Sequence, residues 1–343
     1  VYPNVMNKPY NFFNNGYQEQ DILKVGIGYF VKYSDKIDTK FKGTPMMRVT
    51  AEREDDGYQD KVLLYEGWNT IGALSYPMNV SYISFDERDA QTPKPTSSYV
   101  FKHGIWGYKT NVGYYETSIL EPGWGYWLKA NPFSSGYLRL VYPEVGRLVA
   151  AENNGKESIL NASTRLSIVD NAQHSTNLYM TNANVDVEYF ELPPVPPAGL
   201  FDARFYNNTI LANTESSVIN LQGIEYPVMI TVNNADAIYI FEDAVTGEVL
   251  GAVKKGENNS IEIKSTANNS IRVLKSEISS DLAVEAYPNP VSATSTIKYV
   301  VPTDGFVTVN LYDALGNQTV LFQGFRTAGV YTLDLNAAKL ASG

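Results

Sequence analysis

The 343-residue sequence predicts an all-β protein made of tandem β-sandwich domains of the immunoglobulin-like kind. Its 25 tyrosines and 14 phenylalanines suit the half-buried faces of pleated strands. After residue 150, short runs of alternating apolar side chains are separated by Asn-, Gly- and Thr-containing turns, which is the pattern of an antiparallel sandwich. A third observation, an internal repeat near the N-terminus, indicates that one β unit has been duplicated.

The repeat relates residues 16–33, GYQEQDILKVGIGYFVKY, to residues 113–130, GYYETSILEPGWGYWLKA, at a constant offset of 97 residues. In each copy the last segment reads as a strand with one wholly apolar face, which we expect to be core. That face carries Trp124, Tyr126 and Leu128 in the second copy and Ile27, Tyr29 and Val31 in the first. The glycines before the aromatic run predict a tight turn or a close approach of two main chains.

The second copy is preceded by VLLYEGWNTIGALSYP, residues 62–77, an apolar segment interrupted by a Gly-Trp-Asn corner. The first copy has no such opening ahead of it, so we expect it to be incomplete or to take its opening strand from another chain. The GWN-x-I opening with the L-x-P-G-x-GYW-x-K closing resembles a β module of secreted proteins of Bacteroidetes and Chlorobi-type bacteria. The resemblance covers residues 62–145 and implies a fold and no activity.

Four domains are predicted. Residues 1–60 form an incomplete β repeat unit, 61–150 the second repeat unit, 151–278 a β-sandwich and 279–343 a C-terminal domain. Within the third, YFELPPVPPAGLFDARF, residues 189–205, should be a sheet edge or a stiff crossing, because proline cannot donate to a central ladder. This segment and the strands after it resemble a sandwich that often precedes the tail of secreted Bacteroidetes proteins.

The last domain, AYPNPVSATSTIKYVVPTDGFVTVNLYDALGN and its continuation, alternates apolar and polar residues as a small sandwich would. Ile297, Tyr299 and Val301 should point inward, Asp304-Gly305 should turn a hairpin, and Gly316 should adopt a positive φ. The motifs, in this order, resemble the type A C-terminal sorting domain of the type IX (Por) secretion system. The residues that carry the resemblance are Tyr287, Pro288, Asn289, Pro290, Asp304, Gly305, Tyr312, Asp313 and Gly316.

The resemblance implies that the domain is an address, read by the type IX translocon and by a surface sortase that removes it. It implies an extracellular location or one on the bacterial outer-membrane surface. The family continues past LASG with another strand and a basic segment, whereas the sequence ends at Gly343. The sequence also begins without an initiator Met or a signal peptide, so we expect it to be incomplete at both ends.

Composition excludes several kinds of function. A formal net charge of −10 and a pI near 4.8 argue against a nucleic-acid partner, since phosphate binding depends on Lys and Arg. The absence of cysteine excludes disulfides, thiolate catalysis and Cys-ligated zinc. The sequence has no run of about 18 apolar residues, so no transmembrane helix is predicted.

The sequence contains no nucleophile elbow, zinc-protease motif, Walker A loop or dinucleotide fingerprint, so we expect no enzymatic activity. Its two histidines lie in different units and are interpreted as structural. No cofactor is expected, with one candidate metal: Asp55, Asp56 and Asp60 around a turn glycine could bind calcium, although the spacing does not match an EF-hand and a solvated hairpin loop is the preferred interpretation. Trp106 and Trp127 could stack on sugar rings, the alternative being burial in the core.

The sequence therefore predicts a non-catalytic secreted or cell-surface protein, exported by the type IX system, with a structural or adhesive role. Units that lack a strand also suit self-assembly, in which neighbours complete each other's sheets. Two alternatives stay open at this point. The chain could be the accessory C-terminal region of a larger secreted hydrolase, or a glycan-binding module.

Overall fold

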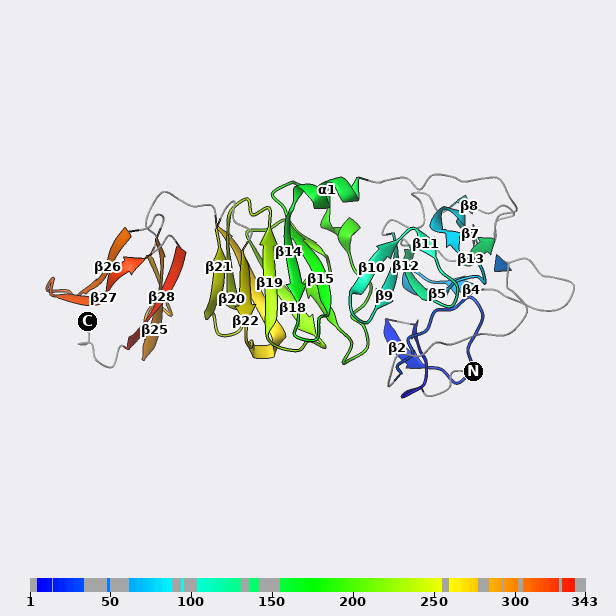
Figure 1. Cartoon of the computed structure of the whole chain (residues 1–343), viewed down its shortest axis with the longest axis horizontal. Coiled ribbons are helices and arrows are strands. Elements are labelled where there is room, and N and C mark those ends of the chain that lie inside the picture. The colour runs from blue at the N-terminus through cyan, green and yellow to red at the C-terminus, as the bar shows by residue number, and fades with distance from the viewer. Residues whose placement is uncertain are drawn as a thin grey trace, which may run out of the picture. The chain divides into compact units, whose positions relative to one another are not determined.

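The computed structural model describes residues 5–13, 15–33, 48–49, 62–87, 94–95, 104–130, 136–141, 155–254, 259–276, 284–291, 293–301, 305–326 and 329–336. The chain forms two compact units, residues 1–161 with 185–211, and residues 162–184 with 212–343. Strands dominate both (Figure 1), which confirms the all-β prediction. Among the described residues the longest helix is α1 (Lys156–Ala162), and none is long and apolar enough to cross a membrane.

In the first unit, the second repeat copy builds an antiparallel sheet with the order β10-β9-β12-β5. Its strands are β5 (Gly67–Gly72), β9 (Ile105–Lys109), β10 (Gly113–Thr117) and β12 (Gly125–Ala130). A second sheet has the order β3-β13-β7-β8, with β4 also paired to β13. These strands are β3 (Arg48–Val49), β4 (Val62–Leu64), β7 (Ile83–Glu87), β8 (Lys94–Pro95) and β13 (Gly136–Val141). The short β6 (Met78–Asn79) pairs with β11 (Ile119–Leu120), and the 3-10 turn η1 (Val80–Tyr82) follows β6.

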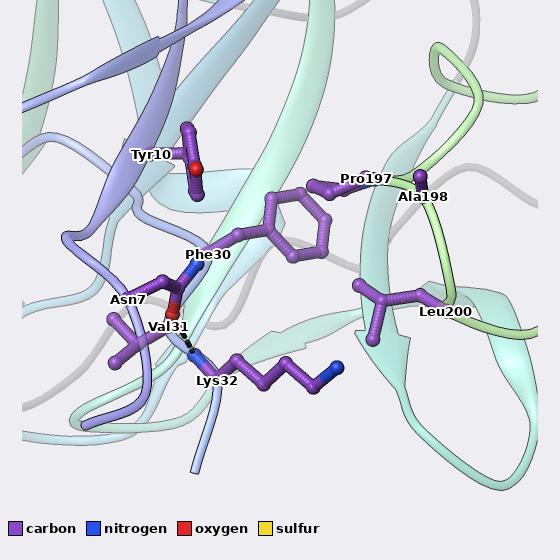
Figure 2. A pocket seen from close by; sticks show the side chains of 8 residues that line it. All are labelled: Asn7, Tyr10, Phe30, Val31, Lys32, Pro197, Ala198 and Leu200. Atoms are coloured by element: carbon purple, nitrogen blue, oxygen red, sulfur yellow. Dashed lines mark hydrogen bonds between the residues drawn. The ribbon is translucent and has the colours of Figure 1, made fainter. Parts of the chain in front are cut away.

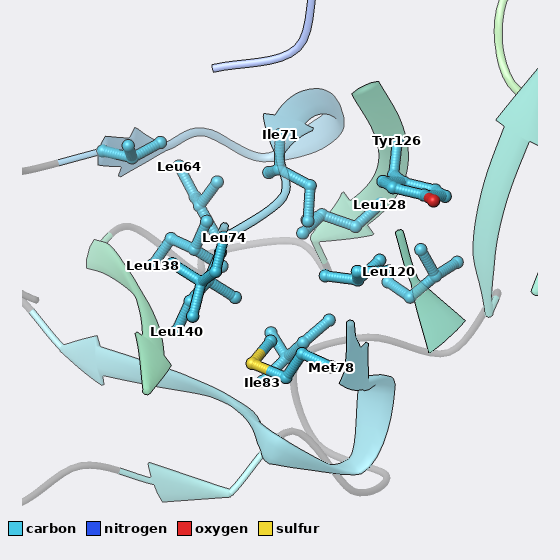
Figure 3. Close-up of a cluster of buried hydrophobic side chains, with 12 residues drawn as sticks. Leu64, Ile71, Leu74, Met78, Ile83, Leu120, Tyr126, Leu128, Leu138 and Leu140 are labelled. Atoms are coloured by element: carbon cyan, nitrogen blue, oxygen red, sulfur yellow. The ribbon is translucent and has the colours of Figure 1, made fainter. Parts of the chain in front are cut away.

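The core of this unit lies where β5 and β12 face β13. Ile71 and Leu128 point toward Leu138 and Leu140, and all four side chains are fully buried (Figure 3). Tyr126 belongs to the same cluster, so the predicted core face is confirmed at Tyr126 and Leu128 of the second copy. Trp124 is an exception: it precedes β12 at the turn formed by Gly123, and 45 % of its surface is exposed.

The first repeat copy is less regular. It contains the hairpin β1 (Tyr10–Phe13) and β2 (Gly16–Glu19), and then an extended segment, residues 26–33, that pairs with the N-terminal residues only at isolated bridges. Those bridges join Tyr10 to Phe30 and Val5 to Tyr33. Ile27 packs against the core described above, as its predicted face requires.

The proline-rich segment belongs to the first unit. It begins with the 3-10 turn η2 (Val187–Phe190) and ends in β16 (Asp202–Phe205) and β17 (Leu211–Ala212). Between η2 and β16 the chain is without regular structure, as the predicted crossing would be. Its hydrogen bonds run to the aromatic side chains of the repeat: the Tyr114 hydroxyl donates to the Pro194 carbonyl and the Tyr108 hydroxyl to the Phe201 carbonyl.

In the second unit, two antiparallel ladders form the sandwich. One has the order β15-β14-β19-β22 and the other the order β18-β23-β20-β21. The strands are β14 (Thr164–Val169), β15 (Ser175–Met180), β18 (Ser216–Gln222), β19 (Val228–Asn233), β20 (Ile238–Asp243), β21 (Val249–Val253), β22 (Ser260–Ile263) and β23 (Ser270–Ser276), with the 3-10 turn η3 (Ala267–Asn269) before β23. Alternate residues of β14 and β19 are buried, which is the pattern of strands with one face on the core.

The C-terminal residues form a three-stranded ladder, β24-β25-β28, and a hairpin, β26-β27. The strands are β24 (Val284–Tyr287), β25 (Thr294–Val301), β26 (Gly305–Tyr312), β27 (Gln318–Arg326) and β28 (Gly329–Asn336). Ile297, Tyr299 and Val301 are buried at alternate positions of β25, which confirms the predicted inward face. The Tyr299 ring stacks on Tyr331 at 5.5 Å.

Candidate functional site

The two repeat copies make the same local contacts. The Lys24 main-chain N–H donates to the Tyr29 hydroxyl at 2.8 Å, and the Glu121 N–H donates to the Tyr126 hydroxyl at 2.7 Å. Both pairs are separated by the repeat offset. Burial raises the pKa of both tyrosines, that of Tyr126 to about 12, so the hydroxyl that accepts this bond is protonated in each copy. A glycine of positive φ precedes each strand, Gly26 at 77° and Gly123 at 81°.

Three glycines let the main chains of the two copies meet. A Cβ on Gly28 would lie 2.7 Å from the Ile71 carbonyl oxygen, and one on Gly125 would lie 3.1 Å from the Gly28 Cα. A Cβ on Gly72 would lie 3.1 Å from the Ile27 carbonyl oxygen. The sequence predicted a close approach at the repeat glycines, and their matched positions 28 and 125 pack against each other.

The aromatic side chains of the two copies form a reciprocal cluster. Within the first copy Phe12 meets Tyr17 edge-on, with centroids 5.4 Å apart, and within the second Tyr108 meets Tyr114 edge-on at 5.3 Å. Across the copies, Phe12 contacts Trp127 at 5.1 Å, and Tyr108 contacts Phe30, the repeat partner of Trp127, at 5.5 Å. Reciprocal contacts of this kind are those of a twofold interface.

The proline-rich segment covers this cluster with polar and charged groups. Glu191 accepts a hydrogen bond from the Trp68 indole at 3.1 Å and forms an ion pair with Lys129. Asp202 and Arg204 form a buried pair, with Arg204 Nε 2.6 Å from Asp202 Oδ2. The Arg204 guanidinium lies over the Tyr114 ring at 5.7 Å. Burial raises the pKa of Tyr114 well above its usual range, so its hydroxyl stays neutral and donates to the Pro194 carbonyl.

A pocket of about 220 Å³ lies beside the first copy. Figure 2 shows the Phe30 ring and the Lys32 side chain directed toward Pro197, Ala198 and Leu200, and Tyr10 also lines the pocket. The Lys32 main-chain N–H donates to Asn7 Oδ1 at 3.1 Å. The lining is mostly apolar with one cation, which suits an aromatic or aliphatic side chain better than a polar reaction centre.

The two tryptophans considered for glycan stacking are buried. Trp106 is 3 % exposed and Trp127 is 2 % exposed, because the repeat partners and the proline-rich segment cover both faces of this part of the sheet. Neither ring has a free face for a sugar, and burial, the alternative considered, describes both. Trp124 is the exposed indole of this unit, because it follows the turn at Gly123, whose φ is positive.

The proposed calcium ligands Asp55, Asp56 and Asp60 lie outside the described residues, so this site stays a prediction. Within the described part of the chain, no group of three or more acidic or histidine side chains is arranged to hold a metal ion. His174 Nδ1 lies 2.8 Å from Asp170 Oδ2 at the turn between β14 and β15, a structural position. His103 also lies outside the described residues.

The C-terminal motif residues gather at turns and strand ends. Tyr287 ends β24 and is 82 % exposed, and Pro288 and Pro290 follow cis peptide bonds. Asp313 Oδ1 accepts hydrogen bonds from the N–H groups of Leu315 and Asn317 at 2.9 and 2.8 Å. Gly316 has a φ of 83°, as predicted, and these groups together close the β26-β27 hairpin.

Of the remaining motif residues, the structure describes Asn289, Gly305 and Tyr312. Asn289 is exposed after β24, Gly305 begins β26 and Tyr312 ends it with 59 % of its surface exposed. Asp304 lies outside the described residues. Among the described motif residues Gly305 is half-buried and the others are exposed, and Asp313 and Gly316 also have a structural role in the turn.

Comparison with known proteins gives no relative. No protein-family model, no curated protein and no solved structure matches this chain.

Proposed function

We propose that this chain is a non-catalytic extracellular protein that reaches the bacterial outer-membrane surface by type IX secretion and has a structural or adhesive role there. The observation that carries the proposal is the ordered motif set of residues 279–343 on a small β domain. Its exposed positions, Tyr287 and Tyr312, can be read by a translocon or a sortase without unfolding.

Export is tested by expressing the full chain in a host with a type IX system and in the same host without its translocon. Surface-added protease should degrade the protein only on cells that have the translocon. Tyr287→Ala should reduce surface protein, while Phe325→Ala, at a residue that is 65 % exposed but outside the motif, should not. The two variants should melt at the same temperature. Equal surface amounts in both hosts would contradict the export route.

The structural part of the proposal predicts self-association. The purified full chain should show a mass that rises with concentration in sedimentation equilibrium, because surface assembly by strand exchange is governed by mass action. A single monomeric mass across the micromolar to millimolar range would contradict assembly and would leave export unaffected.

A further inference from the structure

Within the described part of the chain, residues 29–33 of the first copy are hydrogen-bonded along one edge only, to the N-terminal residues, while Gly26 at the start of the segment accepts a bond from the Gly72 N–H of β5. The Phe30 N–H donates to the Tyr10 carbonyl at 2.8 Å and the Tyr10 N–H donates to the Phe30 carbonyl at 2.9 Å. Main-chain groups of successive residues in an extended strand point to opposite edges. The N–H and C=O groups of Tyr29 and Val31 therefore face the other edge, where no hydrogen bond to them is formed within the described part of the chain.

The second copy shows what covers this edge when it is complete. Its matching strand, β12, has β9 on one side and β5 on the other. β5 runs antiparallel with Tyr126 opposite Ile71, Leu128 opposite Asn69 and Lys129 opposite Trp68. Tyr29, Val31 and Lys32 are the repeat partners of Tyr126, Leu128 and Lys129, so the register of a strand on the open edge is defined.

The side-chain environment is also repeated. In the second copy the Trp68 indole packs edge-on against Trp127 at 6.4 Å, and the Lys129 ammonium lies 5.9 Å from the Trp68 ring. The partners of Trp127 and Lys129 in the first copy are Phe30 and Lys32, and both line the pocket closed by Pro197, Ala198 and Leu200. A Trp placed opposite Lys32 has the same two neighbours as Trp68.

We propose that the open edge of Tyr29 and Val31 accepts an extended strand from a separate polypeptide with the pattern of β5, Gly-Trp-Asn-x-Ile. The strand adds antiparallel, with its Ile opposite Tyr29, its Asn opposite Val31 and its Trp opposite Lys32. Main-chain hydrogen bonds supply affinity, and the pocket beside Phe30 selects an aromatic side chain. This inference rests on the geometry of the repeat and is independent of the export route.

The probe is a labelled peptide with the sequence of Val62–Leu74, VLLYEGWNTIGAL, which contains β5 and its corner. Two modified peptides serve as a matched pair, because N-methylation removes a donor without changing a side chain. Methylation of the Asn and Ile nitrogens should weaken binding to the full chain by roughly tenfold or more, since these face Val31 and Tyr29. Methylation of the Trp and Thr nitrogens, which face away, should change it by no more than about threefold.

Hydrogen exchange locates the peptide and tests the pocket. The amides of Tyr29 and Val31 should exchange rapidly in the free chain and become protected when the peptide binds. Replacing the peptide Trp by Ala should weaken binding about tenfold or more, as loss of a buried aromatic anchor does.

Three results would overturn the proposal. The first is absence of binding at millimolar peptide, and the second is equal binding of the two methylated peptides. The third is protection of the Tyr29 and Val31 amides in the free chain at every concentration, which would mean that the chain covers this edge itself. None of these results bears on export, so the two proposals fail separately.

Discussion

The close approach at Gly28 gives a sharp test of how the repeat copies pack. In Gly28→Ala, the new Cβ would lie 2.7 Å from the Ile71 carbonyl oxygen and 3.2 Å from the Ile71 nitrogen. Neither atom is free to move, because β5 pairs with β12 and the Gly72 N–H donates to the Gly26 carbonyl at 2.9 Å. Overpacking of this kind costs about 1–3 kcal/mol.

An opposing effect must be subtracted. Alanine reduces the entropy of the unfolded chain and stabilises a protein by about 0.4–1 kcal/mol where the native conformation suits it. Gly28 is outside the positive-φ region, so alanine has no conformational penalty there. The net expectation is a loss of about 1–2 kcal/mol, which for a unit of this size lowers the melting temperature by about 2–8 °C.

The assay uses the tryptophans. All four, at positions 68, 106, 124 and 127, lie in the first unit, so urea unfolding followed by Trp fluorescence reports this unit alone. The control is Gly16→Ala, where a Cβ has no atom within 4 Å and φ is not positive. The control should be unchanged or slightly stabilised. If Gly28→Ala and Gly16→Ala unfold at the same urea concentration, the packing argument is refuted.

Three further changes test the charged groups and the turns. Burial alone would raise the pKa of Asp170, but hydrogen bonds from the Glu225 N–H and from His174 lower this pKa below its usual 3.8. The Asp170 carboxylate therefore stabilises the fold above pH 3.8, and this contribution is lost as the pH falls through the lowered folded-state pKa. Asp170→Asn should flatten the acid dependence of the melting temperature measured by circular dichroism. Arg204→Met leaves the buried Asp202 carboxylate unpaired and should cost about 3–5 kcal/mol in Trp-monitored unfolding, with partial recovery when Asp202 is also replaced by Leu. Gly316→Ala forces alanine into a φ of 83° and should cost about 1 kcal/mol by calorimetry; an unchanged transition would contradict the turn assignment.

Local patterns in the sequence predicted most of the strands and several turns. Alternation identified the buried positions of β25, and Gly316 was recognised as a turn residue from its neighbours alone. The repeat was visible as identities at one offset, and its matched hydrogen bonds follow from those identities. These features depend on residues close in sequence or duplicated within it, so a single sequence contains the information.

Features that depend on distant segments were predicted poorly. Burial of Trp127 was one of the two alternatives considered, but the sequence did not show what would bury it: Leu192 of the proline-rich segment and the aromatic rings of the first copy pack over this side chain. No local pattern at Trp127 indicates which segment arrives more than sixty residues later. Trp124 was predicted to lie in a strand, but the turn at Gly123 places it before the first residue of β12. The predicted strand boundary was therefore wrong by one residue.

The reciprocal packing of the two copies accounts for their aromatic faces but not for the edge of Tyr29 and Val31. Twofold contacts between Phe12 and Trp127 and between Tyr108 and Phe30 bury the aromatic face of each copy against the other. A face can be closed in this way, but a strand edge also has main-chain groups that need hydrogen bonds in the plane of the sheet, and an added strand supplies them. In the second copy β5 meets this need, and the duplication supplies no equivalent strand among the described residues of the first. The edge and its neighbouring pocket thus follow from the architecture itself, and a peptide with the β5 pattern measures whether a partner uses them.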